Sequence, residues 1–157
     1  MLLTPHTFVG VAIASLIPNP FIAVPLSFIG HFLGDKVPHW DFFSNTKKEE
    51  RTTGWRPMAV MADLAVGVAV GVAFTSYAYW SLNDVNYALN IFLCGIASVL
   101  PDALSSLDLF LGKKGKLLNL LNRTQSAMQF QAPLPWGIIT QIIVIAISLY
   151  LFSNSTR

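Results

Sequence analysis

Charged residues and cysteine are scarce in this chain of 157 residues. Asp, Glu, Lys and Arg make up only 11% of the sequence, whereas 54% of it is hydrophobic and the mean hydropathy is +0.56. This composition is too apolar for a soluble domain of this size and indicates an integral membrane protein. The net charge is only +2, and the basic residues do not alternate with aromatic residues. The sequence therefore predicts no nucleic-acid partner.

Cys94 is the single cysteine of the chain, and it lies within an apolar run. One cysteine can form neither an internal disulfide nor a cysteine-based metal site, so a metal ion would need nitrogen and oxygen ligands. The N-terminal region also lacks a basic segment and a cleavage site of small residues before Pro18. We therefore predict no removable signal peptide.

Apolar runs divide the chain into a pair of short helices and three longer helices. Thr4-Pro5 is typical of a helix start, and Pro18-Asn19-Pro20 breaks the first run. The two runs within residues 4–36 are each shorter than the roughly 20 residues that cross a bilayer, so we predict a hairpin that leans on the longer helices. The transmembrane helices are predicted at 55–81, 85–111 and 133–153. The predicted fold is an all-α, integral membrane helical bundle with one domain, residues 1–157.

Two polar segments, residues 37–54 and 112–132, separate these apolar regions. Five Lys and Arg lie in or beside the first segment and four lie in the second. Two membrane crossings separate the segments, so they are predicted on the same side, and the positive-inside rule makes both of them cytoplasmic loops. The N-terminus is then also cytoplasmic. Residues 117–121 favour a short amphipathic helix at the membrane surface.

Histidines and acidic residues are concentrated after the second short apolar run. His31 and Asp35 are four residues apart, so in a helix both side chains leave from one face and can reach the same cation. Pro38 ends that helix, and His39 and Asp41 follow in a turn that could fold back over the same site. For Asp41, a solvated carboxylate is an equally good interpretation.

Ionisable residues within the apolar helices are predicted to lie at one depth. A charge at a helix centre costs about 2.5 to 3.5 kcal/mol on insertion scales, so each one needs a partner or a function. At the helical rise, Asp63 lies roughly 12 Å from Trp55, and Asp102 lies roughly 15 Å from Gly112. With His6 and the His31/Asp35 pair, five ionisable groups from four segments are predicted to gather in the cytoplasmic half of the membrane.

A site with these nitrogen and oxygen donors suits zinc, with manganese or iron also possible. A catalytic site of this kind would leave one coordination position for water and lower the pKa of that water. A carboxylate outside the coordination shell could then accept the proton.

Other interpretations of the same residues stay open at this point. His6 could lie among lipid headgroups. The His31/Asp35 pair could be an ion pair or hydrogen bond at a helix end. Asp63 and Asp102 could form one structural pair between two helices.

The order of these motifs resembles a known family. The motifs are His6-x-x-x-Gly10, Gly30-His31-Phe32-Leu33-Gly34-Asp35, Pro38-His39-Trp40-Asp41, an Asp in the next helix and Leu100-Pro101-Asp102. This pattern, which extends from Thr4 to Gln141, resembles small bacterial inner-membrane proteins described as membrane-bound metal-dependent hydrolases. The His-x-x-x-Asp spacing is similar to that of zinc-dependent phospholipases C.

The resemblance implies a metal-dependent phosphoesterase or related hydrolase in the bacterial inner membrane. The residues that it implies as metal ligands are His6, His31, Asp35, His39, Asp63 and Asp102. Asp63 and Asp102 are also the candidate catalytic residues. Relatives often carry a further histidine before the last transmembrane helix, whereas residues 121–125 contain none.

Two functions follow from these expectations. The first is hydrolysis of a phosphate ester, with a membrane lipid as the leading substrate and partner because the site opens where headgroups lie. Lys36 and Arg56 are close enough to this site to steer an anionic headgroup.

The alternative is a non-catalytic membrane protein with a structural metal or an ion- or proton-handling site. A transporter usually has two similar halves with broken helices in both, and only one half here contains a broken pair. The sequence predicts no oligomeric state.

Overall fold

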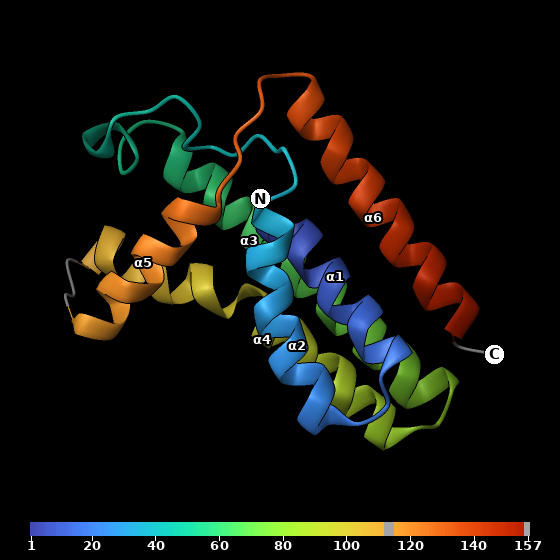
Figure 1. Cartoon of the computed structure of the whole chain (residues 1–157). Helices are drawn as coiled ribbons and strands as arrows, with labels where there is room; N and C mark the ends of the chain where they lie inside the picture. Colours follow the sequence, from blue (N-terminus) through green and yellow to red (C-terminus); the bar gives the residue numbers. More distant parts are fainter. Residues whose placement is uncertain (112–114, 156–157) are drawn as a thin grey trace.

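The structure, a computed structural model, describes residues 1–111 and 115–155, without the side chains of Lys48 and of residues 107–111. Within these residues the fold is all-helical, as predicted (Figure 1). The helices are α1 (Leu3–Leu16), α2 (Pro20–Asp35), α3 (Arg56–Ser76), α4 (Val85–Leu111), α5 (Lys116–Met128) and α6 (Trp136–Ser155). A π-helical turn, Tyr77–Ser81, continues α3, and a 3-10 turn, Lys48–Glu50, lies in the loop before it.

Among the described residues, three stretches of helix are long and apolar enough to cross a membrane: Arg56–Ser81, Val85–Ser106 and Trp136–Ser155. Large apolar side chains on these helices remain exposed, among them Met58 (76%), Phe92 (46%) and Ile142 (59%). Exposed apolar surface of this kind marks a face that lipid or protein covers. The prediction of three long apolar helices is therefore confirmed.

The two short apolar helices, α1 and α2, run side by side against α4 (Figure 1). Asn19 caps the start of α2, because its side-chain oxygen accepts a hydrogen bond of 3.0 Å from the backbone nitrogen of Phe21. Close packing on α4 depends on Gly10, since a Cβ atom there would lie 2.6 Å from the carbonyl oxygen of Cys94. The side chain of Asn90 donates hydrogen bonds to two carbonyl groups at the end of α1. The hairpin is thus fixed to α4 along its length.

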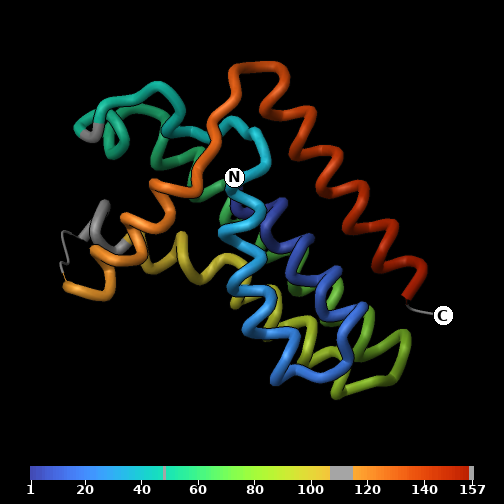
Figure 2. Tube along the Cα trace, viewed as in Figure 1, coloured from blue at the N-terminus to red at the C-terminus, as the bar shows by residue number. Residues whose placement is uncertain are grey.

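The polar loop after α2 and the segment before α6 lie side by side at one end of the helices (Figure 2). The backbone nitrogen of His39 donates to the carbonyl of Phe130 at 3.0 Å, and that of Phe130 donates to the carbonyl of Asp35 at 2.9 Å. A single parallel bridge pairs His39 with Gln131. The two predicted polar segments therefore meet at the same end of the bundle.

Three local features differ from the expectations or add to them. α5 extends over Lys116–Met128, beyond the short helix expected at 117–121. α6 begins at Trp136, after Pro133 and Pro135, and not at 133. α4 changes direction along its length (Figure 1), and Pro101 lies inside it, where the ring removes a backbone hydrogen bond and bends the helix.

Candidate metal centre

Four ionisable side chains meet where one end of α1, one end of α2 and the bend of α4 come together. His6 lies near the start of α1, His31 and Asp35 lie in the last two turns of α2, and Asp102 follows the proline of α4. His6 and His31 are fully buried and Asp35 is 1% exposed, whereas the Asp102 side chain is 28% exposed. Three groups thus lie in the interior, and the fourth connects them to the outside.

The distances among these groups suit a shared cation. Nε2 of His6 lies 3.2 Å from Oδ1 of Asp35, and Nε2 of His31 lies 3.5 Å from Oδ2 of the same residue. Nε2 of His31 also lies 3.6 Å from Oδ1 of Asp102. One donor atom each from His6, His31 and Asp102 lies within 4.8 Å of the others. Ligands at about 2.1 Å from a tetrahedral zinc ion are separated by roughly 3.4 Å, so small adjustments would bring this group to that geometry.

The histidine rings are oriented as metal ligands are. Nδ1 of His31 lies 2.9 Å from the carbonyl oxygen of Ser98, so this nitrogen carries the hydrogen and Nε2 presents its lone pair to the carboxylates. His6 stacks on His31, with ring centroids 4.0 Å apart. Nδ1 of His6 and Oδ2 of Asp35 are buried and have no hydrogen-bond partner among the described residues. Such unpaired atoms cost roughly 1 to 3 kcal/mol each, and a cation bound beside Oδ2 would offset this cost for the carboxylate.

His39 extends the group from the loop after α2. Its ring is fully buried, and Nδ1 lies 2.8 Å from the carbonyl oxygen of Val37, which again directs Nε2 inward. The amino group of Met1 lies 2.7 Å from this Nε2 and donates to Asp35, so His39 and Asp35 already hold one cationic group between them. Burial, together with that positive charge, lowers the pKa of His39. A low pKa keeps the imidazole neutral, which is the form that binds metals.

Asp63 has a different environment from the other predicted ligands. Its Oδ2 accepts from the backbone nitrogen of Leu3 at 2.6 Å, and its Oδ1 accepts from the hydroxyl of Thr4 at 2.7 Å. Asp63 thus caps the N-terminus of α1 from α3, and it lies outside the group of His6, His31 and Asp102. Asp63 and Asp102 have separate partners, so they do not form the pair between helices that the sequence left open. The roles of Asp63 as ligand and catalytic residue stay predictions.

Asp41 has a local structural role. Its Oδ1 accepts hydrogen bonds from the backbone nitrogen of Phe43 at 2.7 Å and from the hydroxyl of Ser44 at 3.2 Å. Its other oxygen lies 3.9 Å from Nε2 of His39. Asp41 therefore organises the turn that follows His39 and lies at the edge of the site.

Gln125 is a site residue that the sequence did not indicate. It is 5% exposed, its Nε2 donates to Oδ1 of Asp102 at 2.7 Å, and the same nitrogen lies 3.1 Å from Nε2 of His31. Its Oε1 accepts from the hydroxyl of Ser105. The segment contains no histidine, and the signal in the sequence that could have indicated Gln125 is the amphipathic pattern of α5. Leu117 and Leu120 of this helix point outward, with 68% and 62% exposed, which turns the polar Gln125 inward.

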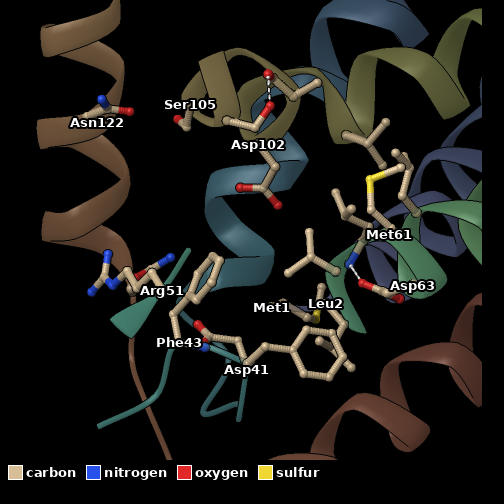
Figure 3. Close-up of a pocket in the computed structure, with 18 of the residues that line it drawn as sticks. Met1, Leu2, Asp41, Phe43, Arg51, Met61, Asp63, Asp102, Ser105 and Asn122 are labelled. Carbon is tan, nitrogen blue, oxygen red and sulfur yellow. Dashed lines mark hydrogen bonds between the residues drawn. The ribbon is translucent and has the colours of Figure 1, made fainter. Parts of the chain in front are cut away.

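A cleft of about 460 Å³ opens beside this group (Figure 3). Asp102 is directed into it, and its polar lining otherwise comes from Asp41, Arg51, Asp63, Ser105, Ser106, Asn122, Ser126 and Gln129. The apolar lining includes Met1, Leu2, Leu3, Phe42, Phe43, Val60, Met61, Leu64, Val99 and Ala103. Asp102 therefore belongs both to the buried donor group and to a space large enough for part of a substrate.

Comparison of the chain with family models, with curated proteins and with solved structures finds no match.

Proposed function

We propose that this protein is a membrane-embedded, metal-dependent hydrolase that cleaves phosphate esters of a lipid or of another molecule at the membrane surface. The observation that carries the proposal is the approach of donor atoms from His6, His31 and Asp102 to within 4.8 Å at the wall of a cleft. Buried histidines beside carboxylates are a costly arrangement unless they bind something.

The donor set supports a divalent metal ion, with zinc as the first candidate and manganese or iron as alternatives. His6, His31 and Asp102 would hold the ion, and Asp35 contacts both histidines and could orient them. His39 is connected to Asp35 through the amino group of Met1. When bound, such an ion lowers the pKa of a water molecule and polarises a phosphoryl oxygen.

We assign the positioning of the ligands and the proton transfer to the protein's own groups. The carbonyl group of Ser98 holds the ring of His31, and the amide group of Gln125 holds one oxygen of Asp102. Asp102 is the one member of the three-residue donor group that lines the cleft, so we assign it the contact with substrate and the transfer of a proton at Oδ2, since Gln125 contacts Oδ1.

The surroundings of the site support a membrane location. Three apolar helices of sufficient length carry exposed apolar side chains, and the short hairpin of α1 and α2 packs among them. The basic residues of the two polar segments favour a cytoplasmic site, and the resemblance of the motifs favours the bacterial inner membrane.

The test is elemental analysis of detergent-purified protein, together with an assay on a panel of phosphate esters. We expect about one divalent ion per chain in the wild type and its loss, with all activity, in His31→Ala and Asp35→Ala. Asp84→Asn is the matched control, because Asp84 lies in the distant turn before α4 and caps it through a side-chain oxygen that Asn retains.

The outcomes separate the two functions. A retained ion without hydrolysis of any ester would favour a structural metal, and wild-type protein without a stoichiometric ion would favour the ion- or proton-handling alternative. Equal activity in His31→Ala and the wild type would contradict the proposed function.

A further inference from the structure

A second, apolar groove of about 100 Å³ lies between α1, α3 and α4. Its lining includes Thr7 of α1, Gly67, Val68, Gly71 and Val72 of α3, and Phe92, Gly95 and Ile96 of α4. Leu3, Leu64 and Val99 line this groove and also line the cleft beside Asp102. The two spaces therefore adjoin, with a polar part at the metal centre and an apolar part that extends between two candidate transmembrane helices.

Glycine residues, which have no side chain, create the groove. A Cβ atom at Gly95 would meet no atom within 4 Å, and one at Gly71 would meet only the methyl group of Thr7 at 3.6 Å. Neither glycine is required by close helix packing, which sets them apart from Gly10 of the hairpin. Their effect is to leave a channel open where larger residues would fit.

The groove opens toward the apolar surface of the molecule. Val68 and Val72 on α3 are 57% and 54% exposed, and Phe92 and Ile96 on α4 are 46% and 45% exposed. In a bilayer these side chains would contact lipid tails. A hydrocarbon chain could therefore enter the groove sideways from the membrane while its polar end reached the cleft.

Arg51 gives the cleft a group that can bind an anion. Its guanidinium lies 5.5 Å from the centre of the Phe43 ring, and Figure 3 shows both residues at the edge of the cleft. Within the part of the chain that the structure describes, the buried Nε of Arg51 has no hydrogen-bond partner. Arginine binds phosphate through two parallel hydrogen bonds, which makes it suited to this role. Since Asp41, Asp63 and Asp102 also line the cleft, an anion there needs this cation and the metal together.

We propose that the cleft and the groove together bind one acyl lipid with a phosphate group. Arg51 contacts the phosphate beside Asp102, and the acyl chain lies between α3 and α4 over Gly67, Gly71 and Gly95. This inference rests on the proposed function for its chemistry, because it names the substrate class of the same site. Free phosphate and a lipid headgroup share the anion-binding part, and only a lipid uses the groove.

The test measures equilibrium binding of three probes to detergent-purified protein. Hexadecylphosphonate carries both the anion and the chain, methylphosphonate carries the anion alone, and hexadecanol carries the chain alone. The carbon–phosphorus bond is not an ester bond, so binding is measured without hydrolysis. Failure of the proposed chemistry therefore leaves this measurement interpretable.

Two variants fill the groove: Gly95→Leu and Gly71→Val. Both replace glycine by a residue with a higher helix propensity, so the helices should be retained. We expect about tenfold weaker binding of hexadecylphosphonate and weaker binding of hexadecanol, with methylphosphonate unchanged, because the added side chains occupy the volume of the acyl chain. Ala73→Leu is the matched control, since it adds bulk to an exposed position of α3 outside the groove lining.

Arg51→Gln tests the phosphate end. We expect about tenfold weaker binding of methylphosphonate and of hexadecylphosphonate, with hexadecanol unchanged, because one charged hydrogen-bond partner is lost. Arg123→Gln on the exposed face of α5 is the control.

Unchanged hexadecylphosphonate binding in both groove variants would overturn the proposed position of the acyl chain. Unchanged methylphosphonate binding in Arg51→Gln would overturn the phosphate position.

Discussion

The amide group of Gln125 occupies the space between two of the proposed ligands. Its nitrogen lies 2.7 Å from Oδ1 of Asp102 and 3.1 Å from Nε2 of His31, so it contacts the atoms that a metal ion would bind. A carboxylate at this position would repel Asp102 in the absence of metal and would offer a further oxygen ligand in its presence.

We therefore predict that Gln125→Glu makes stability depend on metal. In chelator, the apparent melting temperature should fall by about 3 to 8 °C, which corresponds to a loss of about 1 to 3 kcal/mol. Addition of zinc or manganese should raise it by more than in the wild type, as measured by tryptophan fluorescence. Gln125→Leu removes the amide group without adding a ligand, and an equal metal-induced rise in that variant would contradict the prediction.

Asp63 is a half-buried carboxylate whose hydrogen bonds to α1 explain its position without a metal. It pairs with the backbone nitrogens of Leu3 and Thr4 at the start of the helix that carries His6. We predict that Asp63→Ala lowers the free energy of unfolding by about 1 to 2 kcal/mol, because it leaves these donors unpaired. Asp63→Asn retains one acceptor oxygen and should retain the metal. Loss of the ion from Asp63→Asn, measured by elemental analysis, would instead identify Asp63 as a ligand.

The sequence predicted that two residues of the candidate site, His31 and Asp35, lie close together, because local geometry relates them. The spacing of His31 and Asp35 places both side chains on one helical face, and the structure brings them to 3.5 Å. The contacts of Asp63 with α1 and of Gln125 with α4 depend on how separate helices pack, which no local spacing encodes. Residue type alone could therefore not distinguish a cap from a ligand.

At the scale of elements, the bend in α4 positions Asp102 within 3.6 Å of His31. Pro101 is buried in this helix, whereas Pro25 is an exposed proline within α2. We predict that Pro101→Ala straightens α4, preserves the helix content and weakens metal affinity at least about tenfold, because it moves one ligand. Circular dichroism and metal titration measure the two effects. Pro25→Ala is the control, and an equal loss of affinity in both variants would argue against a specific role of the bend.

The lengths of the apolar runs predicted the number and order of the long helices and of the hairpin. Helix ends were less predictable, since α5 continues to Met128 with its polar face against α2 and α4. That face is stabilised by Gln125 and by the backbone contacts of the following segment. These contacts form only in the folded protein, so the sequence of the segment resembled a loop with one short helical turn.

The whole molecule places its two polar segments and the candidate metal centre at one end and the turn Leu82–Asp84 at the other (Figure 1). Two predicted membrane crossings between the segments would require this arrangement, and the basic residues of the segments predict that their side is cytoplasmic. We predict that Lys47→Cys and Lys116→Cys are protected from a membrane-impermeant maleimide in intact bacterial cells, whereas Asn86→Cys reacts. All three positions are exposed and Cys94 is buried, so the native thiol should give little background. Lysis should make Lys47→Cys and Lys116→Cys reactive. Labelling of these two variants from opposite sides of the membrane would contradict the bundle topology. Labelling of both variants in intact cells would agree with the topology, but it would place the site outside the cytoplasm and contradict the orientation that the positive-inside rule predicts.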